Sequence, residues 1–286
     1  RDQGDVAVAR SALDTSLDLA QRHVALEGPA DADAAAVGLD LMARTHESAA
    51  VFAWEQGDQE ESLRWSREAL ATRERQRALA PSNRDAAIAY SRDLQVICDR
   101  LGPRDFSAAE RLCEQSLKTA EGIVRSDPFD LDAQERLLQA LNAMAGIRFS
   151  QLRLKEAEDY SRQALDKAKL LAAHDPDDAR RQSQVGAVLA LRADILRLAG
   201  EISPAEASSM LGAAGVQVAG AAAQARGTAM ENKAREVLAH FRDRQADLER
   251  APTEKDRLLA PVIQARKQVA SRPEDARSLR ALADAL

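Results

Sequence analysis

A proline returns along this chain at a nearly fixed interval. Pro81, Pro128 and Pro176 are 47 and 48 residues apart (128−81 and 176−128), and Pro273 follows 97 residues later (273−176). The segments between these prolines carry apolar residues at helical spacing, and none shows the alternation that is typical of a strand. Self-similarity at a fixed period is the signature of stacked structural repeats. The period therefore predicts an array of similar helical units and no sheet.

Glycine and proline divide the chain into predicted helices that form pairs around short breaks. Glycine ends a helix cheaply in the left-handed conformation, and proline bars the preceding residue from helical angles. The predicted helices cover residues 4–27, 31–56, 59–79, 83–101, 105–126, 130–152, 155–173, 178–199, 226–250 and 254–270, with a small-residue-rich helical segment after residue 200. Pro261 should kink the last of these helices or restart it.

The period also aligns side chains. Leu70, Leu117 and Leu165 keep the same 47- and 48-residue intervals (117−70 and 165−117). In the preceding helix of each pair, one position is always small; it holds Ala50, Cys98, Ala145 and Ala193. A recurring small residue is what close approach of two helices needs, and a bulky residue nearby fills the adjacent hole.

One stretch carries a family resemblance. Met144-Ala145-Gly146-Ile147-Arg148-Phe149, followed by Lys155-Glu156-Ala157-Glu158-Asp159-Tyr160 and Ala164-Leu165, resembles a tetratricopeptide repeat, although the period here exceeds the family's usual length of about 34 residues. The resemblance implies an all-α, right-handed α-solenoid of antiparallel helix pairs, a tetratricopeptide-like superhelix. We expect this array over residues 1–200, and a degenerate or continuing part of the same solenoid over 201–286.

Composition and charge argue against two classes of partner. The net charge is −6, and no stripe of Lys and Arg is present, so the chain is poorly suited to neutralising nucleic-acid phosphates. No run approaches 18 apolar residues, so we expect no membrane insertion. The chain opens with Arg1 instead of Met and ends inside a helical pattern, which suggests a piece of a larger protein.

The two cysteines, Cys98 and Cys113, are too few for a disulfide framework and match no zinc spacing. We interpret them as small apolar fillers between helices in a reducing compartment. The predicted localisation is cytoplasmic; an extracytoplasmic part of a larger membrane protein is the alternative.

Motifs for catalysis are missing from the sequence. It contains no glycine-rich phosphate loop, no Gly-x-Ser-x-Gly and no His-Glu-x-x-His. The four histidines, His23, His46, His174 and His240, are each interpreted as structural or solvated. We therefore predict no enzyme activity, no cofactor and no metal site.

The family resemblance implies that the first helix of each pair lines an inner, concave wall that holds a peptide or a helix. Counting from the recurring small position, residues six and three before it and one and four after it should face that groove. The candidate groove residues are Arg44, Glu47, Trp54, Arg92, Gln95, Asp99, Gln139, Asn142, Phe149, Asp194 and Arg197. Trp65 matches a bulky core position, whereas Trp54 could be either core or anchor.

The predicted function is a protein-interaction scaffold or a sensory module of a larger bacterial signalling protein, with a protein or peptide as partner. Two alternatives stay open. The array could hold another segment of its own protein and so regulate an attached kinase or protease domain. It could instead sense a small molecule, in a pocket between the array and residues 200–286.

Overall fold

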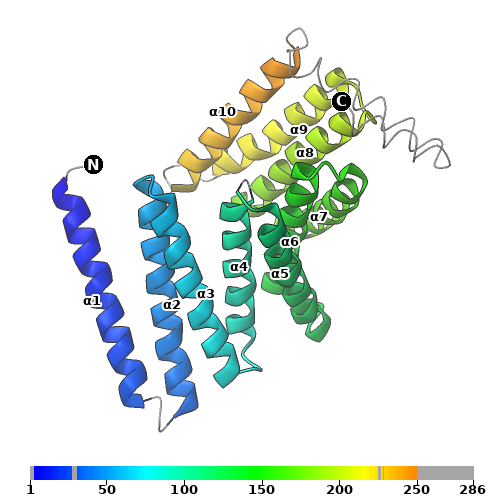
Figure 1. The fold of residues 1–286 in the computed structure, drawn as a ribbon. Helices are drawn as coiled ribbons and strands as arrows, with labels where there is room; N and C mark the ends of the chain where they lie inside the picture. Colours follow the sequence, from blue (N-terminus) through cyan, green and yellow to red (C-terminus); the bar gives the residue numbers. More distant parts are fainter. Residues whose placement is uncertain (1–2, 28–30, 103, 225–226, 228, 250–286) are drawn as a thin grey trace, which may run out of the picture. The chain divides into compact units, whose positions relative to one another are not determined.

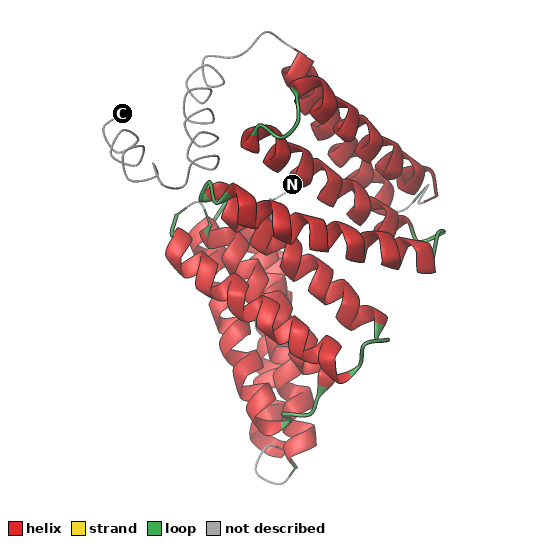
Figure 2. Cartoon of the chain, turned by 90° about the vertical axis from the view of Figure 1, so that its right-hand side faces the viewer, coloured by secondary structure: helices red, strands yellow, loops and turns green. Residues whose placement is uncertain are grey.

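The computed structural model describes residues 3–27, 31–102, 104–224, 227 and 229–249, and these residues form α-helices joined by short turns (Figures 1 and 2). The helices are α1 (Gln3–Glu27), α2 (Ala32–Glu55), α3 (Gln59–Leu79), α4 (Arg84–Leu101), α5 (Phe106–Ser126), α6 (Leu131–Ser150), α7 (Leu154–His174), α8 (Ala179–Ala199), α9 (Pro204–Gln224) and α10 (Ala229–Glu249). No strand occurs among them. The all-α prediction is confirmed for this part of the chain. The predicted helix over 254–270 lies outside the described residues.

The helix boundaries recur with the same period as the prolines. The side chains of Asn83, Asp130 and Asp178 each accept a hydrogen bond from the first turn of α4, α6 and α8, at intervals of 47 and 48 residues (130−83 and 178−130). Asp58 and Asp105 cap α3 and α5 in the same way, 47 residues apart (105−58). A capping carboxylate or amide satisfies backbone N–H groups that the helix leaves unpaired. The repeat is therefore one of structure as well as of sequence.

The helices fall into two compact units, Arg1–Ile147 and Arg148–Leu286, and each is described here by itself. In the first unit, α1 packs on α2, α2 on α3, α3 on α4, and α4 on α5 (Figure 1). In the second, α7 packs on α8, α8 on α9, and α9 on α10. Within each unit, these helices therefore pack on their neighbours in chain order, as in a helical repeat.

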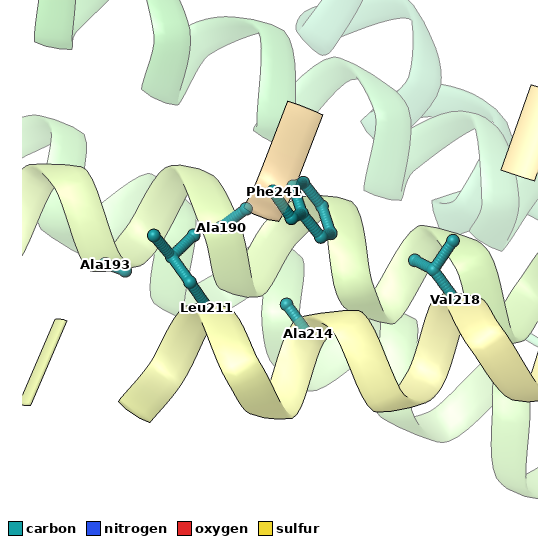
Figure 3. Close-up of a cluster of buried hydrophobic side chains, with 6 residues drawn as sticks. All are labelled: Ala190, Ala193, Leu211, Ala214, Val218 and Phe241. Atoms are coloured by element: carbon teal, nitrogen blue, oxygen red, sulfur yellow. The ribbon is translucent and has the colours of Figure 1, made fainter. Parts of the chain in front are cut away.

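The core of the second unit depends on close helix approach. Ala190 and Ala193 of α8 face Leu211, Ala214 and Val218 of α9, and Phe241 of α10 closes the cluster (Figure 3). A Cβ atom added at Gly186 would lie 2.6 Å from Val218 Cγ2. The predicted small positions are also buried, with Ala50 at 2% exposure and Ala145 at 0%. Small residues therefore set the distance between neighbouring helices.

The expectation of two unlinked cysteines is wrong. Cys98 of α4 and Cys113 of α5 form a disulfide, with a Cα–Cα distance of 5.6 Å. The helices α4 and α5 are consecutive and pack on each other, so two small positions that face across their interface bring the sulfur atoms together. Both cysteines are fully buried, as the filler interpretation required. The cross-link, and not only packing, therefore joins α4 to α5.

Reduction of this disulfide is expected to lower the free energy of unfolding. The bond joins residues with a sequence separation of 15. Closing a loop of about 15 residues stabilises a folded chain by about 3 kcal/mol, because it removes conformational entropy from the unfolded state. Urea unfolding with and without dithiothreitol measures the difference. The matched control is the double variant Cys98→Ala, Cys113→Ser, which copies Ala145 and Ser161 of the next repeat and should not respond to the reductant.

Among the described residues, no helix is both long enough and apolar enough to cross a membrane.

Candidate functional site

The first unit contains a crevice between α2 and α4, with α3 beneath it. Its volume is about 330 Å³. Small and apolar side chains form its floor, and charged side chains form its rim. The lining residues are Glu47, Ala50, Val51, Ser66, Ala69, Arg92, Asp93, Val96 and Arg100. We call this feature the α2–α4 crevice. Its volume lies at the lower end of the range of sites that hold small molecules or single side chains of a partner.

Large apolar side chains lie exposed along α2, and one of them, Val51, lines the crevice. Val37, Leu41, Val51 and Trp54 are between 49% and 58% exposed. Their spacings of four, ten and three residues (41−37, 51−41 and 54−51) place them along one side of the helix. Isolated exposed apolar residues are common on soluble proteins, but a row of them beside a cavity is typical of an interaction surface.

The rim of the crevice is held in place by ion pairs. Glu47 accepts hydrogen bonds from Arg92, at 2.6 Å, and from Arg73, at 2.8 Å. Arg100 lies over the Trp54 ring at 5.7 Å and also donates to the Ser62 carbonyl oxygen, at 3.1 Å. The cation over the ring limits the orientations of Trp54, so the exposed aromatic side chain is partly preorganised.

Arg73 of α3 lies behind the rim and is 1% exposed. It donates to Asp40 and to Glu47, and it also donates to Gln76 Oε1 at 2.9 Å. Its Nε forms an ion pair with Asp93 Oδ2 at 3.5 Å. The geometry of this contact is not that of a hydrogen bond, and neither atom has another hydrogen-bond partner. One buried guanidinium therefore holds together carboxylates from α2 and α4, and it connects three consecutive helices.

Burial, and then the nearby charge of Glu47, raise the pKa of Asp93 to about 7 from its ordinary 3.8. Between these two values the folded chain keeps a proton that the unfolded chain has released. The free energy of unfolding should therefore fall as the pH rises through this window. Asp93→Asn is expected to flatten that fall, as measured by urea unfolding of both chains at about pH 5 and about pH 8. Equal pH dependence in the two chains would contradict the assignment.

A second polar group lies further along the same side of α4. The amide of Gln95 hydrogen-bonds Asp99. Asp99 keeps part of its surface exposed, but the surrounding protein excludes much of the water and raises the pKa of its carboxyl to about 6. Burial, with the nearby charge of Arg92, lowers the pKa of Arg136 on α6 to about 10. Arg136 Nε and Nη2 are buried without a hydrogen-bond partner.

The structure brings some of the predicted groove residues together. Glu47 and Arg92 meet at the rim, and Trp54 lies under Arg100 beside it. Arg44 is exposed and pairs with Asp40 at 2.7 Å. The roles of all these residues in binding stay predictions.

The remaining groove candidates lie elsewhere. On α6, Gln139 bridges Arg136 and Glu135, and Asn142 Oδ1 has no hydrogen-bond partner. Phe149, Asp194 and Arg197 belong to the second unit. There, Asp194 is buried and forms an ion pair with Arg244 of α10. These residues likewise stay predicted.

The candidate set did not include Val51, Asp93, Val96 or Arg100, which all line the crevice. The rule taken from the family does select the position of Val51, one residue after Ala50, but it passes over the other three. A signal existed for Val51, because it lies on the same side of α2 as Leu41. Arg73 was also missed. The positions one and two periods later hold Ala120 and Ala168, both buried, so an arginine there is an exception to the repeat that a closer alignment would reveal.

Cys98, Asp99 and Cys113 place three potential ligand atoms within 4.8 Å of one another. The two sulfur atoms are bonded to each other, so this group is described by the disulfide rather than as a metal site.

Comparison with known proteins does not assign this chain to a family. No protein-family model matches this sequence, and no curated protein matches it. BtubC (BKLC) from P. vanneervenii is 17% identical, with a TM-score of 0.48, over 85% of this chain and 94% of BtubC. The structure named DHF58 filament is 16% identical, with a TM-score of 0.17, over 85% of this chain and 96% of that one. The candidate site therefore rests on its own geometry.

Proposed function

We propose that this chain is a protein-interaction module that holds a peptide or an amphipathic helix of a partner at the α2–α4 crevice. The observation that carries the proposal is the exposed pair Val51 and Trp54 next to a crevice with an apolar floor. The periodic caps and the packing in chain order support the further proposal of a tetratricopeptide-like solenoid, to which the family resemblance assigns a right-handed superhelix. A scaffold or sensory role within a larger bacterial signalling protein is part of the same proposal.

The crevice suits one kind of contact. Apolar area removed from water is the main source of binding energy, and a few buried anchors usually contribute most of it. A bulky apolar side chain of the partner would enter the crevice between Ala69 and Val96, and its neighbour would cover Trp54. Both walls of the crevice are helices held by ion pairs. Binding therefore requires little loss of side-chain or backbone freedom in this chain.

The rim chemistry favours acidic residues next to that anchor. The two carboxylates of the rim, Glu47 and Asp93, already face Arg73. The rim charge that water reaches most is the Arg92 guanidinium, whose side chain is 46% exposed. Complementary charge guides orientation and association rate more than it adds affinity. We therefore assign the partner a bulky apolar residue flanked by Asp or Glu.

The disulfide bears on where this binding takes place. Buried disulfides persist in oxidising compartments and are rare in a reducing cytoplasm. The Cys98–Cys113 bond therefore supports the extracytoplasmic alternative over the cytoplasmic prediction.

The proposal is tested by selecting peptides from a random library on the immobilised chain and measuring their affinity by fluorescence anisotropy. The selected peptides should share a bulky apolar residue with acidic neighbours. Trp54→Ala should weaken their binding about ten-fold or more, because it removes an anchor-sized aromatic side chain. Val51→Ala should weaken it in the same direction.

Phe129→Ala provides the matched control, since Phe129 lies in the same unit and is 91% exposed but does not line the crevice. It should leave the affinity unchanged. If the selected peptides bind the Trp54 and Val51 variants as tightly as the original chain, the crevice is not the binding site.

A further inference from the structure

A second cavity lies in the first unit, on the other side of α2 from the crevice residues. Its volume is about 370 Å³, and α1, α2 and α3 enclose it. Leu13 and Leu17 of α1 form one wall, Phe52 of α2 and Trp65 of α3 form the others, and His46 also lines it. We call it the α1 cavity. It shares no lining residue with the α2–α4 crevice, so the two sites can be tested separately.

His46 is an exception to the repeat. The positions one, two and three periods later hold Leu94, Leu141 and Leu189, at intervals of 48, 47 and 48 residues (94−46, 141−94 and 189−141). His46 itself is buried, with 6% exposure. A leucine at this place needs no hydrogen-bond partner, whereas a buried imidazole does. The polar substitution occurs in the repeat that has a cavity beside this position.

The hydrogen bonds of His46 decide what it offers to the cavity. Its Nδ1 lies 3.5 Å from Thr72 Oγ1, and the Thr72 hydroxyl donates to the Glu68 carbonyl oxygen at 2.8 Å. The Thr72 oxygen therefore acts as an acceptor toward His46, and Nδ1 carries the hydrogen. Burial lowers the pKa of His46, against the opposing charge and backbone hydrogen bond of Glu68, and so favours the neutral ring. In this tautomer Nε2 carries a lone pair and accepts a hydrogen bond.

Aromatic surface and negative charge complete the cavity. The Trp65 ring stacks on His46, with the ring centroids 5.5 Å apart. The indole Nε1 of Trp65 donates a hydrogen bond to Glu61 at 3.3 Å. Asp14, Asp58 and Glu61 line the cavity together with one cation, Arg10. Glu61 is paired with Arg10 at 3.3 Å and also, at 3.0 Å, with Arg64, whose guanidinium lies over the Trp65 ring outside the cavity lining. Asp14 is exposed and has no ion pair among the described residues. The carboxylates outnumber the cation, which favours a positively charged ligand.

We propose that the α1 cavity binds an arylalkylamine whose ring carries a hydrogen-bond donor. The ring packs between Trp65, Phe52 and Leu17. The ring donor hydrogen-bonds His46 Nε2, and the ammonium group lies at the mouth near Asp14. This is a small-molecule site in addition to the proposed peptide site, and it lies on different residues.

Four small probes separate these contributions in the unmodified chain by calorimetry. Tyramine carries the phenol and the ammonium group, phenethylamine lacks the phenol hydroxyl, tyrosol lacks the charge, and 4-hydroxyphenylpropionate has the opposite charge. Tyramine should bind about five-fold or more tightly than phenethylamine and than tyrosol, the size expected for one hydrogen bond or one exposed ion pair. The anion should bind weakest. The proposal is overturned if tyramine does not bind, or binds no better than phenethylamine and the anion.

Two variants assign the contributions to residues. His46→Leu restores the residue of the other repeats, and it should reduce the tyramine-to-phenethylamine ratio to about one. Asp14→Asn should reduce the tyramine-to-tyrosol ratio in the same way, whereas Asp18→Asn, on the same helix outside the cavity, should not. In a Trp54→Phe chain Trp65 is the only tryptophan, so its quenching by tyramine reports on this cavity. Unchanged ratios in both variants, or no response of Trp65, would refute the site.

Discussion

Arg73→Met is expected to lower the free energy of unfolding by about 3–5 kcal/mol, the usual range for removing one partner of a buried ion pair. Methionine keeps most of the volume but removes the charge. Asp40, Glu47 and Asp93 would then face one another without the guanidinium that now compensates them. Urea unfolding of the two chains measures the loss.

Arg67→Met on the same helix is the matched control, because Arg67 is exposed. Its effect should stay within about 0.5 kcal/mol, as for most surface substitutions. Arg73→Lys should fall between the two, since an ammonium group keeps the charge but cannot present the planar fork that reaches both α2 and α4. An Arg73→Met chain as stable as the Arg67→Met chain would show that the buried network contributes nothing to folding.

Leu165→Ala is expected to cost about 2–5 kcal/mol, which is typical of truncating a leucine in a packed core. Leu165 is 9% exposed on α7 and takes the place that Leu117 takes in the preceding repeat. Removal of the side chain leaves a cavity that the neighbouring helices fill only in part. The loss should appear in urea unfolding of the full chain.

Leu170 lies five residues later on the same helix and is 56% exposed. Leu170→Ala is the same chemical change at an exposed place, so it should cost no more than about 0.5 kcal/mol. Similar losses for the two variants would contradict the assignment of Leu165 to the core.

The sequence period predicted the helix boundaries closely because these boundaries are set by residues close to them in the sequence. Glycine, proline and capping residues act on the backbone within one turn, so the ends of the described helices other than α9, for which no bounds were predicted, agree with prediction within three residues. Asp178, for example, caps α8 through its own side chain, with no help from distant residues. The handedness of the array is a sum of many small rotations, and the period carries no information on it.

The disulfide and the Arg73 network depend on which side chains face each other across helices. The period placed Cys98 at a small position but did not show that Cys113 lies opposite it. A buried arginine is rare without partners, and its three carboxylates come from two other helices. Nothing in the sequence alone places Arg73 beside these carboxylates.

The candidate crevice was predictable in part. Counting from the small position found Glu47 and Arg92, which do meet at its rim. It passed over Arg100, because the family rule selects positions by number and not by the volume left between particular side chains. Val51 stands at a counted position, one residue after Ala50, but was not included among the candidates. From the sequence alone, His46 was interpreted as structural or solvated. Its alignment with Leu94 and Leu141 was available in the sequence, but the cavity beside it was not.

The covalent link between α4 and α5 also determines how the first unit responds to tension. When a stacked array is pulled from its ends, each hairpin that gives way releases its full contour length. Cys98 and Cys113 have a sequence separation of 15. The disulfide carries the applied force past the segment between them, so this segment does not extend. At about 3.3–3.6 Å per residue, roughly 50 Å of extension would appear only after a reductant reaches the buried sulfur atoms. Force and redox state would then act on the same hairpin.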